Sequence, residues 1–214
     1  MKVLVVGANG QIGKLLVEQL QHHEHHTVRA MVRSEDQAKA LEKQGIEAVV
    51  ADLEGSVSSI AEAVGDCEAI VFTAGSGGST GSDKTLLIDL DGAVKTVEAA
   101  EKAGVQRFVM VSALQAHRRE NWSEQIKPYY VAKHFADRAL TQSALDYTIL
   151  RPGGLVNEPG TGRIRMADNI ETGRIPRADV AAAIIAVLDQ KNTFRRAVDL
   201  VSGDQSIQEA VRHI

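Results

Sequence analysis

The sequence predicts one doubly wound α/β domain, in which helices cover both faces of a mostly parallel sheet of about seven strands. Short apolar runs rich in β-branched residues alternate with segments of helical periodicity along most of the 214 residues. This alternation is the pattern of parallel strands joined by crossover helices. The strand runs are apolar throughout, as expected where a sheet is covered on both faces. Chains of this length commonly form a single α/β domain, so we expect residues 1–214 to be one domain.

Three evenly spaced glycines join the first predicted strand, Val3–Val6, to a helix whose periodicity begins at Ile12. Gly7 would allow the chain to turn out of the strand, and Gly13 would allow the helix to lie close to it. Gly10 would let bare backbone approach an anion at the helix N-terminus, where free N–H groups and the helix dipole favour negative charge. A dinucleotide pyrophosphate is therefore predicted here, and a βα turn without a ligand is the alternative. The predicted contacts are Gly7, Asn9, Gly10, Gln11, Ile12 and Gly13.

Composition and charge argue against several other classes of protein. The net charge of −4 gives no reason to expect nucleic acid or an anionic membrane as a partner. No apolar run is long enough to span a bilayer. The only cysteine, Cys67, excludes an intramolecular disulfide and suits a reducing compartment, so we expect a cytoplasmic protein. Four histidines lie within 22–26 at a predicted helix end, where a solvated turn is favoured over a metal site.

The second predicted strand, Thr27–Val32, ends at the position that selects between the two nicotinamide dinucleotides. An Asp or Glu about twenty residues after the glycine turn usually accepts a hydrogen bond from the ribose 2′-hydroxyl of NAD(H). Arg33 and Ser34 stand there instead. Because a guanidinium attracts and matches a 2′-phosphate, NADP(H) is predicted in preference to NAD(H). The alternatives are that Arg33 stacks on the adenine or caps the next helix.

Small residues follow the fourth predicted strand, as expected where a cofactor lies over the C-terminal edge of a sheet. They are Thr73, Ala74 and Gly75, and a run of glycine and serine over 75–82 continues from them as a mobile flap or a flexible loop. The predicted helices of this part of the chain are 35–44, 56–64 and 83–103, and the predicted strands are 47–51 and 68–72. The last helix is expected to bury Leu86, Leu87, Leu90, Val94 and Val97.

Residues suited to proton transfer follow the fifth predicted strand, Arg107–Val111. Ser112 comes directly after it, and Tyr129 and Lys133 lie four residues apart on the next predicted helix, where they share a face. A nearby ammonium lowers the pKa of a phenol, which would let Tyr129 exchange a proton near neutral pH. Tyr130 is the competing phenol, directed about a hundred degrees away.

A polar loop over 115–122 is expected above the mouth of the site. His117 or Arg118 could contact an anionic substrate there, although a solvated loop is the favoured interpretation. The sixth predicted strand, Asp146–Leu150, ends in the turn Arg151, Pro152 and Gly153. The segment 157–169 is glycine-rich and is predicted to be irregular, and it would cover the site within a small lid at about 153–176. The remaining predicted elements are a helix up to 188, whose Asp179 is a first-turn charge, and a strand over 197–201.

The G-x-x-G-x-x-G turn and the Ser…Tyr-x-x-x-Lys set together resemble the short-chain dehydrogenase/reductase superfamily with its NAD(P)-binding Rossmann fold. The resemblance covers essentially the whole chain and is greatest to the atypical and extended branches, including NmrA-like proteins and flavin or biliverdin reductases. It implies catalytic roles for Ser112, Tyr129 and Lys133. It implies cofactor contacts, beyond the glycine turn, from Arg33, Ser34, Asp52, Leu53, Thr73, Ala74, Gly75, Val111, Lys133, Arg151, Pro152 and Gly153. Asp52 could equally be a turn residue.

The leading hypothesis is an NADP(H)-dependent oxidoreductase in which Tyr129 protonates a small carbonyl substrate that receives hydride. A non-catalytic NADP(H) sensor of the NmrA-like type is the first alternative. An epimerase or dehydratase that uses the cofactor transiently is the second, and the fold does not choose among them. A small-molecule substrate, neither nucleic acid nor membrane, and a monomer or homodimer complete the expectations.

Overall fold

The computed structural model describes residues 1–78 and 80–214; Ser79, within the predicted glycine- and serine-rich run, lies outside the described residues. The strands are β1 (Lys2–Val6), β2 (Thr27–Val32), β3 (Glu47–Val50), β4 (Ala69–Phe72), β5 (Arg107–Val111), β6 (Asp146–Pro152), β7 (Gly154–Val156), β8 (Arg163–Ala167), β9 (Arg174–Pro176), β10 (Arg196–Ser202) and β11 (Gln205–Ser206). The α-helices are α1 (Gln11–Gln21), α2 (Glu35–Glu42), α3 (Val57–Val64), α4 (Ser82–Lys84), α5 (Ala93–Ala103), α6 (Lys127–Gln142), α7 (Arg177–Leu188) and α8 (Ile207–Arg212).

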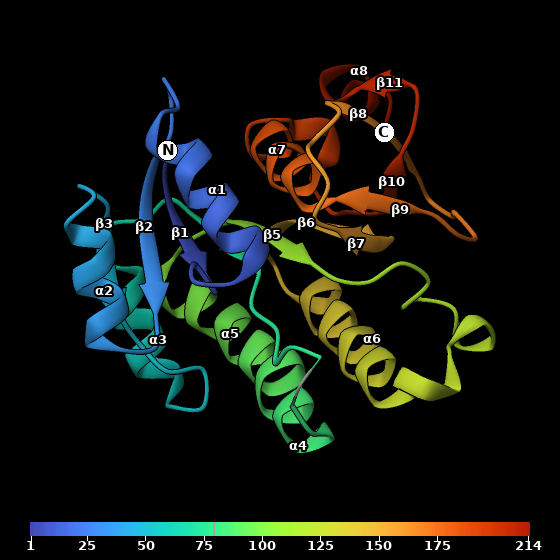
Figure 1. Cartoon of the computed structure of the whole chain (residues 1–214). Coiled ribbons are helices and arrows are strands. Elements are labelled where there is room, and N and C mark those ends of the chain that lie inside the picture. The colour runs from blue at the N-terminus through green and yellow to red at the C-terminus, as the bar shows by residue number, and fades with distance from the viewer. Residues whose placement is uncertain (79) are drawn as a thin grey trace.

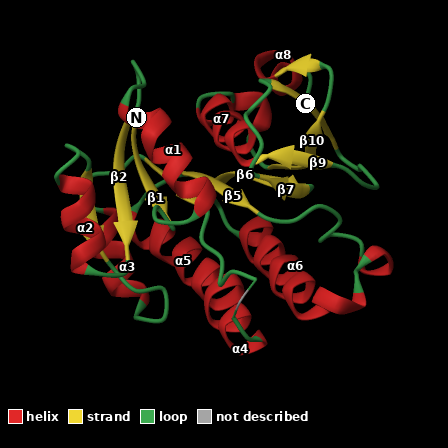
Figure 2. Ribbon diagram, viewed as in Figure 1, coloured by secondary structure: helices red, strands yellow, loops and turns green. Residues whose placement is uncertain are grey.

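Nine strands form one sheet in the order β11-β8-β10-β6-β5-β4-β1-β2-β3 (Figures 1 and 2). Neighbouring strands from β3 across to β10 are parallel. The chain starts at β1, in the middle of the sheet, and builds first toward β3 and then toward β10. The order therefore reverses beside β1 and β4, and in such sheets ligands bind outside the carboxyl ends of the strands at this point.

Each face of the sheet has its own hydrophobic core. Alternate residues of β1 contribute to the two cores, Val3 and Val5 to one and Leu4 and Val6 to the other. The first core includes side chains of α1, α2, α7 and α8, and the second includes side chains of α3, α5 and α6. Figure 1 shows α1 and α7 on one side of the sheet and α5 and α6 on the other. The predicted doubly wound α/β fold is thus confirmed.

The predicted lid contains more regular structure than the sequence indicates. Within 153–176 the chain forms β7, β8 and β9, and β8 lies inside the range 157–169 for which an irregular segment was expected. β8 joins the main sheet antiparallel to β10, and β11 pairs with its other edge, which raises the strand number from about seven to nine. Ile164 is fully buried between the exposed Arg163 and Arg165, so β8 does alternate. Its short length and glycine-rich flanks conceal that alternation.

The predicted helix over 83–103 is interrupted by a π-helix at Thr85–Gly92. Its hydrogen bonds span five residues, so the buried face turns relative to an α-helix. Leu86 and Leu87, which were expected in the core, are 51% and 39% exposed, whereas Asp89 is buried. The prediction for these two leucines is wrong for this reason. No helix in the described part of the chain is both long and apolar enough to cross a membrane.

Candidate functional site

The glycine turn between β1 and α1 is a cradle that side chains would fill. Gly7 has φ +85°, and a Cβ there would lie 2.7 Å from the Cα of Ala74. A Cβ on Gly13 would overlap the carbonyl oxygen of Gly7, so this residue lets α1 pack directly on the turn. Gly10 is the exposed N-cap of α1 and supplies no capping side chain to the first-turn N–H groups. These features fit the pyrophosphate of a dinucleotide.

The three other predicted contacts of this turn differ in burial. Asn9 and Gln11 are exposed beside Gly10, and Ile12 is buried beneath them. Only backbone and polar side chains are therefore presented to a ligand at the start of α1. A Cβ on Gly10 would come within 3.1 Å of the Gly7 carbonyl oxygen, so the turn itself favours glycine here and contact with a pyrophosphate stays a prediction.

The end of β2 presents an exposed cation. Ser34 is the N-cap of α2, where its hydroxyl accepts a hydrogen bond from the backbone N–H of Gln37 at 3.4 Å. The capping role considered for Arg33 is thus filled by its neighbour. The Arg33 backbone N–H donates to Gln37 Oε1 at 3.2 Å, and its side chain is exposed. The guanidinium is therefore accessible to an adenosine 2′-phosphate or to the adenine face.

The pair after β3 has one surface and one core residue. Asp52 is exposed, and its Oδ1 accepts a hydrogen bond from the Glu54 N–H at 2.9 Å, which is the turn role allowed for it. Leu53 is buried, and a Cβ on Gly92 of the π-helix would approach its Cβ to 3.1 Å. Contact of this pair with an adenine stays a prediction.

The small residues after β4 are held between the glycine turn and the π-helix. Thr73 Oγ1 donates to the Val6 carbonyl at 3.0 Å, and Ala74 lies against Gly7. A Cβ on Gly75 would come within 3.1 Å of Asp89 Oδ1. The other Asp89 oxygen accepts a hydrogen bond from the Ser76 N–H at 2.9 Å. This turn therefore runs over the carboxyl ends of β1 and β4, where the reversal of strand order predicts a ligand.

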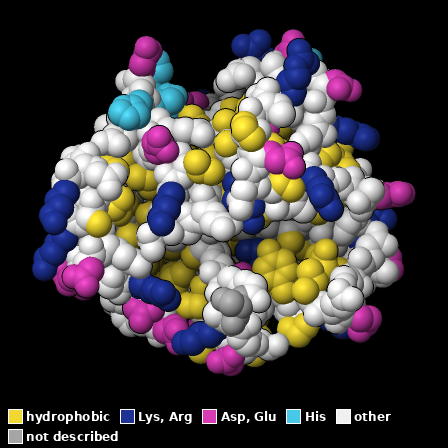
Figure 3. Space-filling model, viewed as in Figure 1, with side chains coloured by type: hydrophobic (Ala, Val, Ile, Leu, Met, Phe, Trp, Pro, Cys, Tyr) yellow, Lys and Arg dark blue, Asp and Glu magenta, His cyan; other side chains and the backbone are white. Residues whose placement is uncertain are grey.

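Tyr129 and Lys133 lie one turn apart on α6, with Lys133 Nζ 5.9 Å from the centre of the Tyr129 ring. Lys133 is buried, and its Nζ is 4.0 Å from Asp89 Oδ1. The competing phenol is placed elsewhere, since the Tyr130 ring stacks on Trp122 with centres 6.0 Å apart. Figure 3 shows hydrophobic side chains gathered over the part of the surface that α6 occupies. The Tyr-x-x-x-Lys pair thus has the shared face that its spacing predicts.

The direction of the Tyr129 pKa differs from the expectation. Burial raises the pKa of Tyr129, and the negative charges of Asp89 and Asp137 add to this effect. Burial lowers the pKa of Lys133, which Asp89 partly opposes. The expected lowering of the Tyr129 pKa by Lys133 is therefore wrong for this structure, because burial and the nearby carboxylates outweigh the ammonium. Tyr129 keeps its proton at neutral pH, as an ordinary phenol also does, and the raised pKa makes it a weaker acid than a free tyrosine.

Ser112 and the Arg-Pro-Gly turn lie at the same edge of the sheet. The Ser112 N–H donates to the Leu150 carbonyl at 2.8 Å, whereas its buried Oγ has no partner among the residues described. Arg151 is buried, and its Nε donates to Asp137 Oδ2 of α6 at 2.8 Å. Its guanidinium is thus held by α6, where contact with the cofactor was expected from the resemblance.

The residues next to Ser112 and Arg151 in the chain are packed into the fold. Val111 is a buried core residue. The Pro152 carbonyl accepts a hydrogen bond from the Leu114 N–H at 2.9 Å. Gly153 lies against the Gly173 backbone, where a Cβ would overlap the Gly173 carbonyl oxygen. Contacts of Val111, Pro152 and Gly153 with a cofactor stay predictions.

Four carboxylates are buried, and none of them was predicted from the sequence to be buried; they are Asp89, Asp137, Asp179 and Asp199. Asp137 follows Lys133 by four residues, and this helical spacing was a usable signal. Asp199 interrupts the apolar run of β10, which is a second usable signal. Asp179, expected as a plain first-turn charge, accepts hydrogen bonds from the N–H and hydroxyl of Thr161 and from the N–H of Gly162. It thereby anchors the loop that leads into β8.

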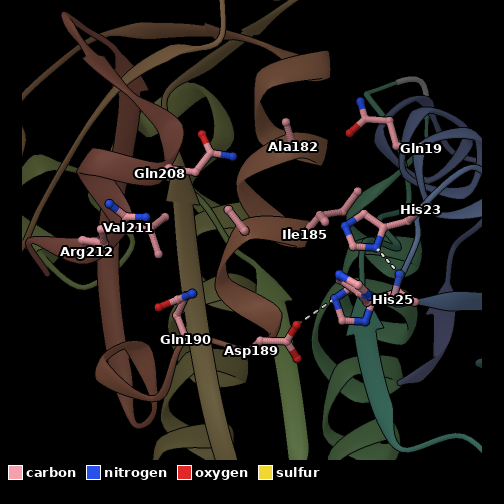
Figure 4. A pocket seen from close by; sticks show the side chains of 12 residues that line it. Gln19, His23, His25, Ala182, Ile185, Asp189, Gln190, Gln208, Val211 and Arg212 are labelled. Carbon is pink, nitrogen blue, oxygen red and sulfur yellow. Dashed lines mark hydrogen bonds and ion pairs between the residues drawn. The ribbon is translucent and has the colours of Figure 1, made fainter.

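The histidine cluster lies at the opposite edge of the sheet, beside a cavity of about 470 Å³ between α1, α7 and α8 (Figure 4). His22 and His25 are exposed, as expected for a solvated turn. His26 departs from that expectation, since it is buried with its Nε2 3.1 Å from Asp189 Oδ2. Burial lowers the pKa of His26, although Asp189 opposes the shift. Among the described residues, no group of three or more His, Cys, Asp or Glu side chains is arranged to hold a metal ion.

Comparisons with known proteins agree with the geometry of the glycine turn. Residues 7–191 match the model of a family described as NAD(P)H-binding. The chain is 61% identical, over the full length of both proteins, to a Bacillus subtilis protein named "Uncharacterized sugar epimerase YhfK". Among solved structures, the oxidoreductase ylbE from Lactococcus lactis has a TM-score of 0.90 at 32% identity, covering 100% of this chain and 96% of that one. The anaerobillin reductase ChuY from Escherichia coli O157:H7 has a TM-score of 0.81 at 28% identity, covering 96% and 99%.

The family match begins at Gly7, the first residue of the turn that would receive the pyrophosphate, and covers most of the chain. The sheet order and the glycine cradle are those of an NAD(P)-binding Rossmann domain. The chain therefore belongs to the NAD(P)H-binding family of atypical short-chain dehydrogenase/reductase proteins.

Proposed function

We propose that the protein is an NADP(H)-dependent oxidoreductase that reduces a small carbonyl compound, with Tyr129 as the proton donor. One observation carries the proposal: Tyr129 and Lys133 share a face of α6 beside the buried Asp89, which also holds the turn after β4. That turn lies against Gly7, so Asp89 connects the Tyr129–Lys133 pair to the glycine turn through the residues that follow β4. Relatives named as an oxidoreductase and as a reductase support the same class of reaction.

The chain's own residues would act on the carbonyl oxygen. NADPH, when bound, supplies the hydride. Tyr129 is protonated at neutral pH, as any phenol with a pKa of about 10 or above is, and can donate that proton to the developing oxyanion. The free Oγ of Ser112 can donate a hydrogen bond to the same oxygen and orient it. Lys133, which lies beside Asp89, would donate a hydrogen bond to the cofactor ribose. Its positive charge would also stabilise the phenolate that remains when Tyr129 gives up its proton.

Preference for NADP(H) is the part of the proposal that rests on Arg33. Its guanidinium is exposed at the end of β2 while Ser34 caps α2. A guanidinium can bind a 2′-phosphate through two parallel hydrogen bonds. A carboxylate at this position would repel the phosphate.

A second candidate function follows from the name of the 61% identical relative, a sugar epimerase. An epimerase of this kind would use the cofactor transiently and restore it, so it would interconvert its substrates without net consumption of NADPH. The same residues Tyr129 and Lys133 would be required. The two candidates are therefore separated by cofactor stoichiometry rather than by site geometry.

The test begins with calorimetric titration of NADPH and NADH into the wild-type protein, Tyr129→Phe and the matched variant Tyr130→Phe. We expect NADPH to bind more tightly than NADH to all three. A screen of carbonyl and flavin substrates should then show NADPH oxidation that Tyr129→Phe abolishes and Tyr130→Phe retains. Binding without Tyr129-dependent turnover would favour a sensor, and product formation without NADPH loss would favour an epimerase. Binding of neither nucleotide would refute the proposal.

A further inference from the structure

Four buried side-chain atoms have no hydrogen-bond partner within the described part of the chain. They are Ser112 Oγ, His117 Nδ1, Asp137 Oδ1 and Asp199 Oδ1. Buried polar atoms in native proteins are nearly always paired, so an unpaired group of them marks a place where something else supplies the partner. Ser112 already belongs to the proposed site, where a substrate oxygen would be its partner. A ligand could supply the partner of the other unpaired atoms in the same way.

Strand register places three of the side chains concerned on one face of the sheet. Arg151 of β6 is the register partner of Asp199 on β10. Ser112 follows Val111, the register partner of Leu150, and therefore lies beside Arg151. Neighbouring residues on parallel strands direct their side chains to the same face. Ser112, Arg151 and Asp199 thus form a row at the carboxyl edge of β5, β6 and β10, on the face that α6 covers.

His117 completes this row from the loop that follows Ser112. Its Nδ1 lies 3.8 Å from Asp199 Oδ1, which is too far for a direct hydrogen bond. The separation is short enough for one oxygen atom to bond with both. The other Asp199 oxygen accepts the Ile170 N–H at 2.9 Å, so the lid fixes the carboxylate and leaves Oδ1 free. His117 has 24% of its side chain exposed, but its Nδ1 and Asp199 Oδ1 are themselves buried, so a ligand oxygen would reach them only when the loop that carries His117 moves.

The charges of the pair decide which chemical group fits. Burial raises the pKa of Asp199 to about 6, with Arg151 opposing the shift, so the carboxylate is largely ionised at neutral pH. Burial lowers the pKa of His117 to about 4, and Arg151 and Arg118 add to this effect, so the imidazole is neutral. An anionic group would be repelled by Asp199. A hydroxyl can donate to Asp199 Oδ1 and pair with the His117 nitrogen at the same time.

We propose that His117 and Asp199 form a subsite for a hydroxyl group of the substrate, which would make the substrate a hydroxy-carbonyl compound. The inference rests on the proposed function, because it places this hydroxyl beside the carbonyl that Ser112 and Tyr129 would hold. Specificity would follow from the general rule that a buried polar pair strongly rejects an analogue lacking the hydroxyl, since the pair is then left unsatisfied.

The first test compares hydroxyacetone with butanone, which has a methyl in place of the hydroxyl. Initial rates of NADPH oxidation give kcat/KM for each ketone with the wild type, Asp199→Asn and His117→Phe. We expect a preference for hydroxyacetone of at least about tenfold in the wild type, and a loss of most of that preference in both variants. Asp168→Asn, an exposed lid carboxylate, is the matched control and should keep it. Calorimetric NADPH affinity checks that each variant folds. Equal kcat/KM for the two ketones in the wild type would overturn the subsite.

The second test does not depend on turnover. Crystals of the NADP⁺ complex soaked in hydroxyacetone should show its hydroxyl oxygen within hydrogen-bond distance of both His117 Nδ1 and Asp199 Oδ1. A water molecule retained between these atoms, or no ketone in the site, would refute the inference while leaving the proposed function intact. If neither ketone nor any screened carbonyl is reduced in a Tyr129-dependent way, the proposed function fails, and the soaked crystal still reports on the subsite.

Discussion

Asp89 Oδ1 lies 4.0 Å from Lys133 Nζ, and both side chains are buried. The second Asp89 oxygen accepts the Ser76 N–H, so one carboxylate connects the lysine of α6 to the turn after β4. Burial lowers the pKa of Lys133 and the charge of Asp89 opposes this shift, whereas for Tyr129 burial and the charge of Asp89 both raise the pKa. A carboxylate on a π-helix is thus the charge that acts most strongly on both residues proposed for catalysis, second to burial.

Replacement Asp89→Asn should move the alkaline limb of the pH–rate profile to lower pH. The amide can still accept the Ser76 hydrogen bond, but it no longer favours the charged form of Lys133 or the protonated form of Tyr129. Both changes make loss of the required proton easier as pH rises. We expect kcat above neutral pH to fall roughly tenfold. A general acid contributes about a hundredfold or more to the rate, and only part of that contribution would be lost.

The measurement is the pH dependence of kcat for a ketone reduced in a Tyr129-dependent way. Asp91→Asn is the control, because Asp91 lies two residues away in an exposed ion pair with Lys95 and should leave the profile unchanged. A profile in which Asp89→Asn coincides with the wild type would show that Asp89 serves only to position the loop.

Gly13→Ala should cost much more stability than Gly45→Ala. A Cβ on Gly13 would overlap the Gly7 carbonyl oxygen, so β1 and α1 must separate, at a cost of about 3 kcal/mol. Gly45 has φ +76° but nothing within 4 Å of a Cβ, so its substitution carries only the left-handed backbone penalty of about 1 kcal/mol. Urea unfolding of the two variants measures the difference. Equal losses would mean that the α1 contact is less tight than the structure has it.

Features encoded by neighbouring residues were predictable, and features made by distant segments were not. The glycine turn and the shared face of Tyr129 and Lys133 follow from local spacing, and both occur as predicted. Burial of Asp89 does not follow from the sequence. The spacing of an α-helix predicts that Leu86 and Leu87 face the core, whereas the π-helix that forms here turns Asp89 inward instead. The approach of His117 to Asp199 depends on the order of β5, β6 and β10, which no local pattern specifies.

Arg33→Ala should weaken NADPH binding about tenfold or more and change NADH binding little. The loss corresponds to the roughly 1.5–3 kcal/mol of a hydrogen bond to a charged group. Ser34 continues to cap α2 in this variant, so the helix should be unaffected. Calorimetric titration of both nucleotides measures the ratio, with Lys39→Ala on the exposed side of α2 as a control for net charge. Equal losses for the two nucleotides would indicate that Arg33 stacks on the adenine instead.

The opposite pKa shifts of His117 and Asp199 should nearly cancel in the pH dependence of stability. Stability rises with pH wherever the unfolded state binds more protons than the folded state. Between about pH 4 and pH 6, unfolded His117 is protonated while the folded residue, with its pKa lowered to about 4, is neutral, so its contribution rises with pH. In the same range unfolded Asp199 is ionised while the folded residue, with its pKa raised to about 6, is protonated, so its contribution falls.

Single variants should expose each slope. Asp199→Asn removes the falling contribution, so its unfolding free energy should rise from about pH 4 to pH 6 by on the order of 2 kcal/mol more than the wild type. His117→Gln should show a difference of similar size and opposite sign. Urea unfolding at both pH values measures the two differences, and the double variant should return to the wild-type slope. If both single variants keep that slope, neither group has the perturbed pKa that its burial implies.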